Sequence, residues 1–126
     1  MKTINKIDVH HHIFPEEYVD TLKEVGVTKS LGVKLPKWNV ITSLKKMKEN
    51  GIQKAMVSIT APGVYFPEAE SNEGFPEELA RIANRSIAKI IREYPDNFGG
   101  FATIPLLNKG AALDELSYAL DELKLY

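Results

Sequence analysis

Residues 6–15 carry the most informative stretch of the chain, which reads Lys6-Ile7-Asp8-Val9-His10-His11-His12-Ile13-Phe14-Pro15. The histidines in it are the only ones in the sequence. The apolar residues before them, together with Ile4, predict a short buried strand. Pro15 then indicates the start of the next element, because proline is favoured in the first turn of a helix.

The spacing of the histidines predicts how their side chains are divided between the two faces of this strand. Side chains alternate along a strand, so Asp8, His10 and His12 are expected on one face and His11 on the other. A His-x-His pair at a strand end aims two imidazoles at one point, and imidazole is a common ligand of zinc-like metals. The alternative is that these histidines are ordinary polar side chains at a strand end, since two ligands make a weaker motif than four.

The bulk composition describes one globular domain, residues 1–126, rather than a disordered or membrane-spanning chain. Of the 126 residues, 44% are apolar and 26% charged, and the formal net charge is −1. This balance argues against a nucleic-acid partner, and no apolar run has the length of a membrane span. The opening residues lack the apolar segment of a secretory signal. Cysteine is absent, which excludes disulfides and thiolate ligands and agrees with a cytoplasmic location.

The rest of the chain alternates predicted helices and strands, which indicates an α/β fold with a parallel sheet and right-handed crossovers. A helix follows Pro15 and stops at Gly26, and a loop or insertion occupies residues 27–39. Further helices are expected over 40–50, 77–94 and from 108 onward. The remaining strands are expected over 55–59, where both faces should be buried, and over 98–104. Residues 60–76 form a long loop after a strand, and in a parallel fold this is the face where ligands bind.

Together these stretches resemble the amidohydrolase-2 branch of the amidohydrolase superfamily, the group of aminocarboxymuconate-semialdehyde decarboxylase. Residues 7–15 resemble the opening strand of that family. Residues 43–52 are similar to the helix that leads into its second strand, and residues 93–106 to its third-strand segment. The resemblance covers essentially the whole chain.

The resemblance implies a distorted (β/α)8 TIM-like barrel with one divalent metal, zinc being the ion expected, at the carboxyl ends of the strands. His10 and His12 would be metal ligands, and His11 would be the variable residue between them. Asp8 would have a supporting, structural or catalytic role. Enzymes of this family hydrolyse amides, esters or lactones, or remove a carboxylate from a small acid, and the metal activates water. His-x-His also suits manganese, iron or cobalt.

The sequence also departs from the family pattern. The family completes its metal site with later histidines and a late aspartate, whereas Asp96, Asp114 and Asp121 are expected in a turn or on a solvated helix face. The chain holds roughly three of the eight strand–helix units of a barrel. It is therefore expected to be the amino-terminal portion of a metal-dependent hydrolase or non-oxidative decarboxylase. We expect it to be weakly active or inactive by itself, with a small molecule as substrate.

Two alternatives belong to other classes. The chain could be a non-catalytic α/β module that forms a homo-oligomer through its sheet edge, with two histidine pairs sharing a zinc ion. A flavodoxin-like binder is the weaker alternative, because residues 11–15 are bulky where a phosphate loop needs glycine. Other side chains are open to two interpretations: Ser58 and Thr103 could bind substrate or cap strands, Tyr65 and Phe66 could contact substrate or pack, and Trp38 is expected to pack.

Overall fold

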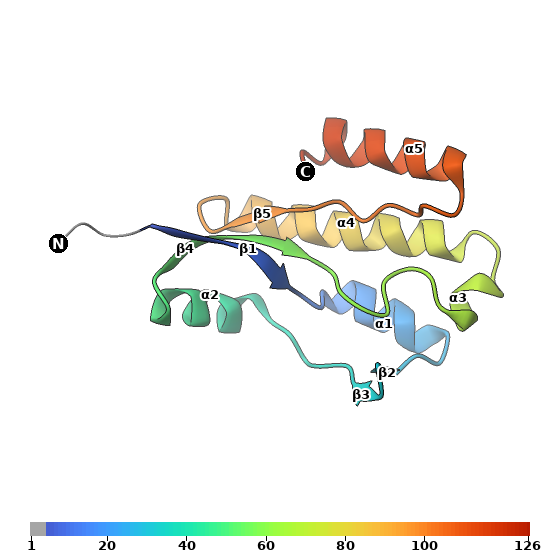
Figure 1. Cartoon of the computed structure of the whole chain (residues 1–126), viewed down its shortest axis with the longest axis horizontal. Helices are drawn as coiled ribbons and strands as arrows, with labels where there is room; N and C mark the ends of the chain where they lie inside the picture. Colours follow the sequence, from blue (N-terminus) through green and yellow to red (C-terminus); the bar gives the residue numbers. More distant parts are fainter. Residues whose placement is uncertain (1–4) are drawn as a thin grey trace.

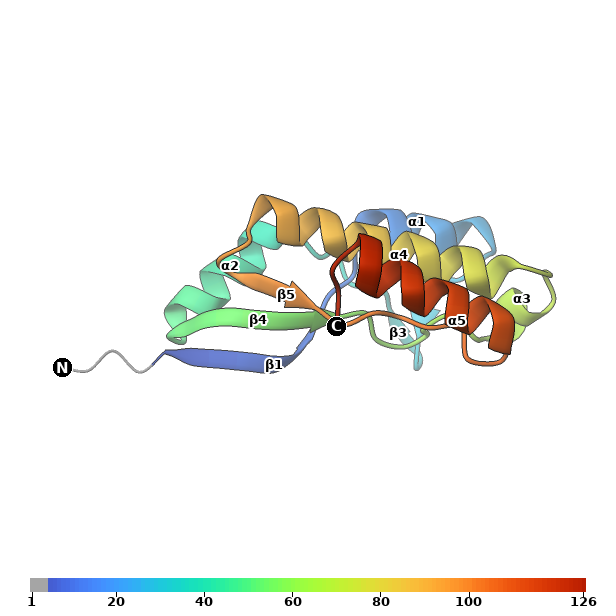
Figure 2. The ribbon, with the colours of Figure 1, turned by 90° about the horizontal axis from the view of Figure 1, so that it is seen from above.

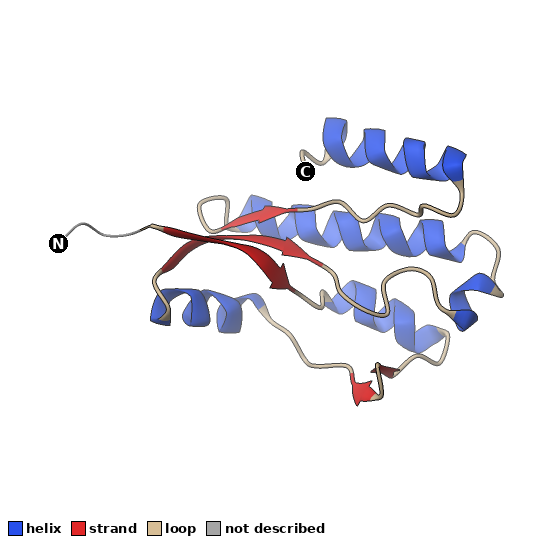
Figure 3. Ribbon diagram, viewed as in Figure 1, coloured by secondary structure: helices blue, strands red, loops and turns tan. Residues whose placement is uncertain are grey.

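The computed structural model describes residues 5–126 and shows helices alternating with strands (Figure 1). Three strands form the main sheet, and a short hairpin of two strands, each of two residues, lies apart from it (Figure 3). In chain order the elements are β1 Lys6–His12, α1 Glu16–Glu24, β2 Lys29–Ser30, β3 Val33–Lys34, α2 Val40–Glu49, β4 Ile52–Ser58, α3 Pro67–Glu70, α4 Phe75–Glu93, β5 Phe98–Gly100, α5 Lys109–Ser117 and the π-helical segment η1 Tyr118–Glu122.

The main sheet is parallel and has the order β1-β4-β5. Helices α1, α2 and α4 lie on one side of it, as Figure 2 shows. On this side Ala55 and Val57 of β4 are fully buried and belong to the same core cluster as Met47 of α2 and Ile87 of α4. The parallel strands and their helical connections confirm the predicted α/β class.

Local sequence signals fix the helix boundaries well. Asparagine immediately before a helix predicts a cap, and the side chain of Asn39 accepts a hydrogen bond from the backbone N–H of Thr42 at 2.9 Å, so it caps α2. Asn108 caps α5 in the same way through the N–H of Ala111. Gly26, just after α1, has a φ of 84°, which glycine adopts without strain. Two segments expected to be irregular contain short elements, the hairpin β2–β3 and the helix α3.

The third strand is shorter than predicted and ends at Gly100 rather than Ile104. The N–H of Ala102 donates to the carbonyl of Tyr126 at 2.7 Å, and the N–H of Tyr126 donates to Gly100 at 2.9 Å. The backbone of Thr103 is bound by the side chain of Asn84 on α4. The N–H of Phe101 still donates to Val57 of β4 at 2.9 Å, so Tyr126 bonds to the other edge of β5. Asn84 takes up the backbone groups of Thr103, the next residue that a longer strand would have offered to β4.

The expected burial of β1 is wrong. Ile7 is 61% exposed and Val9 65% exposed, and Ile4 lies outside the described residues. The strand β4 is likewise buried on one face only, with Met56 and Ser58 half-buried. Both strands share one reason: the second face of the sheet carries no helix among residues 5–126. In addition, β1 lies at the edge of the sheet.

The apolar stripes of two helices are also more open than their periodicity predicts. Ile41 of α2 is 63% exposed, and Leu113, Leu116 and Leu120 of the last helical segment are 56%, 38% and 41% exposed. The carboxy-terminal helical segment instead buries Ala112, Glu115 and Ala119 against α4 and its surroundings. Helical spacing predicts an apolar stripe here, but the face that packs inward carries the carboxylate of Glu115, which bonds to Asn84 and Arg81 of α4.

Tyr18 ties α1 to the loop after β4. Its hydroxyl donates to the carbonyl of Gly63 at 2.7 Å, and the side chain is fully buried, which raises the pKa of the phenol well above its usual value. We expect Tyr18→Phe to lower the free energy of unfolding by about 1 kcal/mol, because it removes one neutral hydrogen bond to the half-buried Gly63. Urea unfolding of both chains measures this. A stability equal to that of the parent chain would contradict it.

No helix of residues 5–126 combines the length and the apolar character needed to cross a bilayer.

Candidate metal-binding site

His10 and His12 converge on the open face of the sheet, near the carboxyl end of β1. Both side chains are exposed, and their Nε2 atoms lie 2.9 Å apart with the rings edge to face at 4.7 Å between centroids. Zinc–nitrogen bonds are about 2.0–2.1 Å long, so two ligands of one ion lie within about 4.2 Å of each other. The observed separation is compatible with both nitrogens binding one ion.

Ser58, at the end of β4, supports this pair from the neighbouring strand. Its hydroxyl lies 3.2 Å from Nδ1 of His12, the ring nitrogen that faces away from His10. A metal-binding imidazole usually donates its second N–H to an oxygen, which fixes the ring orientation and the tautomer. Ser58 is therefore a hydrogen-bond partner of His12 rather than a strand cap alone.

A β-bulge in β1 changes which residues share a face. Asp8 pairs with Ala55 and His11 pairs with Val57, so three residues of β1 are matched by two of β4. The expectation that Asp8 lies with His10 and His12 is therefore wrong. Asp8 and His11 are neighbours, with Oδ2 of the carboxyl group 3.2 Å from Nδ1 of the imidazole.

Asp8 holds this bulge through both of its carboxylate oxygens. Oδ1 accepts the backbone N–H of His10 at 3.0 Å, while Oδ2 faces the ring of His11. The hydrogen bond from the His10 backbone is the main reason that the pKa of Asp8 lies below its usual value, and partial burial opposes it. The ionised carboxylate is thus stabilised by the turn of the chain that separates His11 from the histidine pair.

His11 points away from the pair, toward the helices. Its Nε2 lies 3.1 Å from the hydroxyl of Ser43 on α2, and its ring packs edge to face on buried Phe98 at 6.5 Å. The hydroxyl of Ser43 also accepts the indole N–H of Trp38 at 2.9 Å. Trp38 is half-buried against the core, in agreement with the packing role expected for it.

The donor set is incomplete as a catalytic metal centre. Within residues 5–126 no group of three or more histidine, cysteine, aspartate or glutamate side chains is arranged to hold a metal ion. Catalytic zinc sites normally take three protein ligands. The described residues therefore offer two converging imidazoles whose separation is compatible with one divalent metal ion.

Other residues considered from the sequence are placed away from the pair. Phe66 is buried against Phe75, and the hydroxyl of Tyr65 accepts the backbone N–H of Leu107 at 2.8 Å, so both side chains have packing partners. Thr103 is bound through its backbone to Asn84. The three later aspartates that the sequence placed in a turn or on a solvated helix face are exposed, as predicted: Asp96, Asp114 and Asp121.

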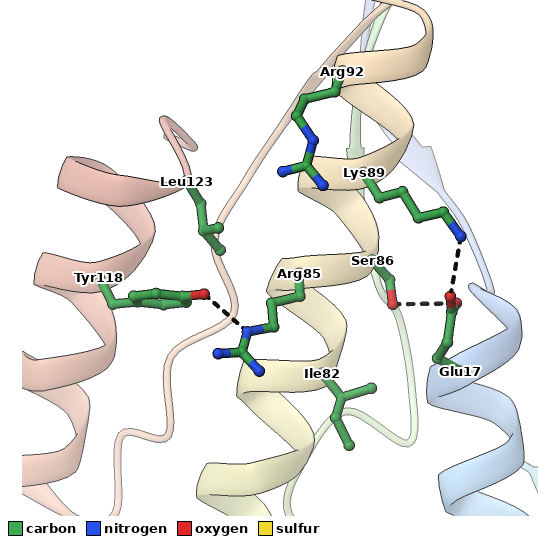
Figure 4. A pocket seen from close by; sticks show the side chains of 8 residues that line it. All are labelled: Glu17, Ile82, Arg85, Ser86, Lys89, Arg92, Tyr118 and Leu123. Carbon is green, nitrogen blue, oxygen red and sulfur yellow. Dashed lines mark hydrogen bonds and ion pairs between the residues drawn. The ribbon is translucent and has the colours of Figure 1, made fainter.

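The structure also has a hollow on the helical layer, away from the histidines. It has a volume of about 430 Å³ and is lined by α1, α4 and the carboxy-terminal segment (Figure 4). Two of the cations of α4 that line it have local partners: Arg85 donates to the hydroxyl of Tyr118 at 2.9 Å, and Lys89 lies 3.6 Å from Glu17. This hydrogen bond to Tyr118 is the main reason that the pKa of Arg85 lies above its usual value. The hollow is a solvated groove between helices.

Comparisons with known proteins find decarboxylases that are similar to nearly all of this chain. No family model matches the chain. It is 38% identical over 123 residues to the decarboxylase yanB of Aspergillus niger, covering 95% of this chain and 33% of that protein. It is 36% identical over 119 residues to the 6-methylsalicylic acid decarboxylase acuB of Aspergillus aculeatus, with coverages of 94% and 35%. The gamma-resorcylate decarboxylase of Rhodococcus jostii is 38% identical over 81 residues, with coverages of 64% and 23%.

Solved structures give the same result. An amidohydrolase II superposes with a TM-score of 0.84 at 28% identity, over 96% of this chain and 38% of that one. A dihydroxybenzoic acid decarboxylase of Polaromonas, solved with manganese and the inhibitor 2-nitroresorcinol, superposes with a TM-score of 0.67 over 96% of this chain and 36% of that one. At 24% identity the latter supports the fold alone.

The chain spans about a third of the length of the curated relatives that it matches over nearly all of its own residues. Its structural neighbours are amidohydrolase barrels, of which it covers a similar share. The resemblance found in the sequence is confirmed: the chain is homologous to the amino-terminal part of decarboxylases of the amidohydrolase-2 family.

Proposed function

We propose that residues 1–126 form the amino-terminal portion of a metal-dependent decarboxylase of aromatic carboxylates, with His10 and His12 as the first two metal ligands. The observation that carries this proposal is the convergence of the two Nε2 atoms, 2.9 Å apart, at the carboxyl end of β1. The decarboxylase names of the relatives support removal of a carboxylate over hydrolysis.

The proposed ion is divalent, and zinc and manganese are the two candidates. Imidazole nitrogens suit zinc, whereas a related fold was solved with manganese. A bound ion would act as a Lewis acid toward the substrate. The residues of this chain would hold the ion through two imidazoles, with Ser58 orienting His12, and the loop over residues 60–76 would lie on the substrate face.

The chain alone is proposed to be a poor catalyst, because two imidazoles leave the metal short of the ligands that a catalytic site normally supplies. Its substrate would be a small molecule. The cytoplasmic location and the homo-oligomer expected from the sequence stay predictions.

A chimaera tests the proposed function directly. The aligned third of a fungal 6-methylsalicylic acid decarboxylase is replaced by this chain, and carbon dioxide release from 6-methylsalicylate is followed with zinc or manganese added. We expect metal-dependent release from the chimaera and none from the same chimaera carrying His10→Ala and His12→Ala. The unmodified fungal enzyme is the control. Equal release from both chimaeras would refute the role assigned to the histidines.

A further inference from the structure

Four side chains form a continuous chain of hydrogen bonds from the helical layer to the bulge in β1. Trp38 contacts Ser43 at 2.9 Å, and Ser43 contacts His11 at 3.1 Å. His11 contacts Asp8 at 3.2 Å, and Asp8 accepts the backbone N–H of His10 at 3.0 Å. The chain ends at the backbone of one of the two histidines that converge on the open face.

The donors and acceptors in this chain fit one direction. An indole N–H can only donate, so the hydroxyl oxygen of Ser43 is the acceptor from Trp38. The hydroxyl proton of Ser43 is then free to be donated to Nε2 of His11. The remaining ring nitrogen of His11, Nδ1, faces the carboxylate of Asp8, which can only accept, so an N–H at this position completes the chain.

The order Asp8–His11–Ser43 matches that of a nucleophilic triad, but its surroundings do not fit one. Ser43 is only 7% exposed, and its oxygen already accepts the N–H of Trp38. A nucleophilic serine needs an oxygen open to substrate and donors placed for the developing oxyanion. The arrangement is therefore suited to fixing a position rather than to attack.

What it fixes is the shape of β1. The extra residue of the bulge separates the face of Asp8 and His11 from the face of His10 and His12. A strand end with exposed imidazoles has little packing of its own to hold this shape, because both rings of the pair lie on the open face. The hydrogen bonds to α2 provide an anchor that is 32 residues away in the sequence and half-buried.

We propose that Ser43, which accepts the indole N–H of Trp38, is a positioning residue. Through its contact with His11, and through that of His11 with Asp8, it keeps the bulge formed. The bulge in turn keeps the rings of His10 and His12 together. The inference deepens the proposed metal site and rests on it for its functional meaning. The geometry of the ring pair itself can be measured without any metal.

The test uses Ser43→Ala in the 126-residue chain. In the metal-free parent chain, proton NMR is expected to show a ring-to-ring NOE between His10 and His12. We expect Ser43→Ala to lose this NOE and to weaken zinc binding about tenfold, the lower end of what is typical when partners of metal ligands are removed. Trp38→Phe, which removes the N–H and leaves a smaller aromatic ring, is expected to act in the same direction.

Thr42→Ala is the matched control, because it removes the neighbouring hydroxyl of the same helix, which bonds to Asn39 instead of His11. It should leave the NOE and the zinc affinity unchanged. An unchanged NOE in both Ser43→Ala and Trp38→Phe overturns the inference, whatever the metal data show. If the parent chain shows the NOE and the variants lose it, but zinc does not bind to the parent chain, positioning is supported and the proposed metal function of this chain is refuted.

Discussion

Replacing His10 and His12 together with alanine is expected to abolish divalent-metal binding by this chain. The two Nε2 atoms are 2.9 Å apart and both side chains are exposed. Among residues 5–126 no other two imidazoles converge in this way. Removing a partner of a metal ligand typically costs 10–100-fold in affinity, and removing both ligands should cost more than about 100-fold. Calorimetric titration of metal-stripped protein with zinc, and separately with manganese, measures the loss.

The control for this experiment is Asp114→Ala, which removes an exposed carboxylate on α5. It should bind metal as the parent chain does. Because the rings of the pair are exposed, the double variant should unfold at nearly the same urea concentration as the parent, so that lost binding is not lost folding. Retained binding at one ion per chain in the double variant would show that other side chains form the site.

Asn84→Ala is expected to give the largest loss of stability, about 3–5 kcal/mol. Asn84 is fully buried and makes three hydrogen bonds, two with the backbone of Thr103 and one with the carboxylate of Glu115. Glu115 is 4% exposed and also pairs with Arg81 at 2.6 Å. Truncation would leave a backbone donor, a carbonyl and a buried carboxylate with fewer partners, and each unsatisfied buried group costs about 1–3 kcal/mol.

Urea unfolding followed by circular dichroism measures this effect, with Asn72→Ala as the control. Asn72 is exposed near the end of α3, so its truncation should change the free energy of unfolding by no more than about 0.5 kcal/mol. A loss below about 1 kcal/mol for Asn84→Ala would mean that the segment after β5 and the last helix are held to α4 by apolar contacts instead.

The features that sequence predicted well are those written locally. The cap at Asn39 and the stop at Gly26 follow from the chemistry of single residues, and the structure places both as expected. The convergence of His10 and His12 follows from the period of two along a strand. This alternation holds within the last three residues of β1, on the far side of the bulge.

What the sequence did not predict depends on contacts between distant residues. The bulge that moves Asp8 next to His11 is visible only in the pairing of β1 with β4. Sequence analysis missed Ser43 and Asn84, although each lies on the buried face of an amphipathic helix. Ser43 is four residues before Met47 on α2, and Asn84 is four residues after Ala80 on α4. A polar residue at such a position was the available signal, since buried polar groups almost always have partners.

The burial of Ile7 and Val9 was wrong for a related reason. Periodicity shows that a strand has an apolar face but not whether another layer covers it. In this chain the layer of helices lies on one side of the sheet only, and both side chains stay more than half exposed.

The place of Trp38 has a further consequence. It is the only tryptophan in the chain, and its indole N–H is bound to Ser43, at the end of the hydrogen bonds that lead to the histidine pair. Indole fluorescence is sensitive to hydrogen bonding and to the polarity around the ring. Tryptophan emission from this protein therefore comes from one indole ring, at the end of the hydrogen bonds that lead to the histidine pair, so a change there can be followed by fluorescence in unlabelled protein.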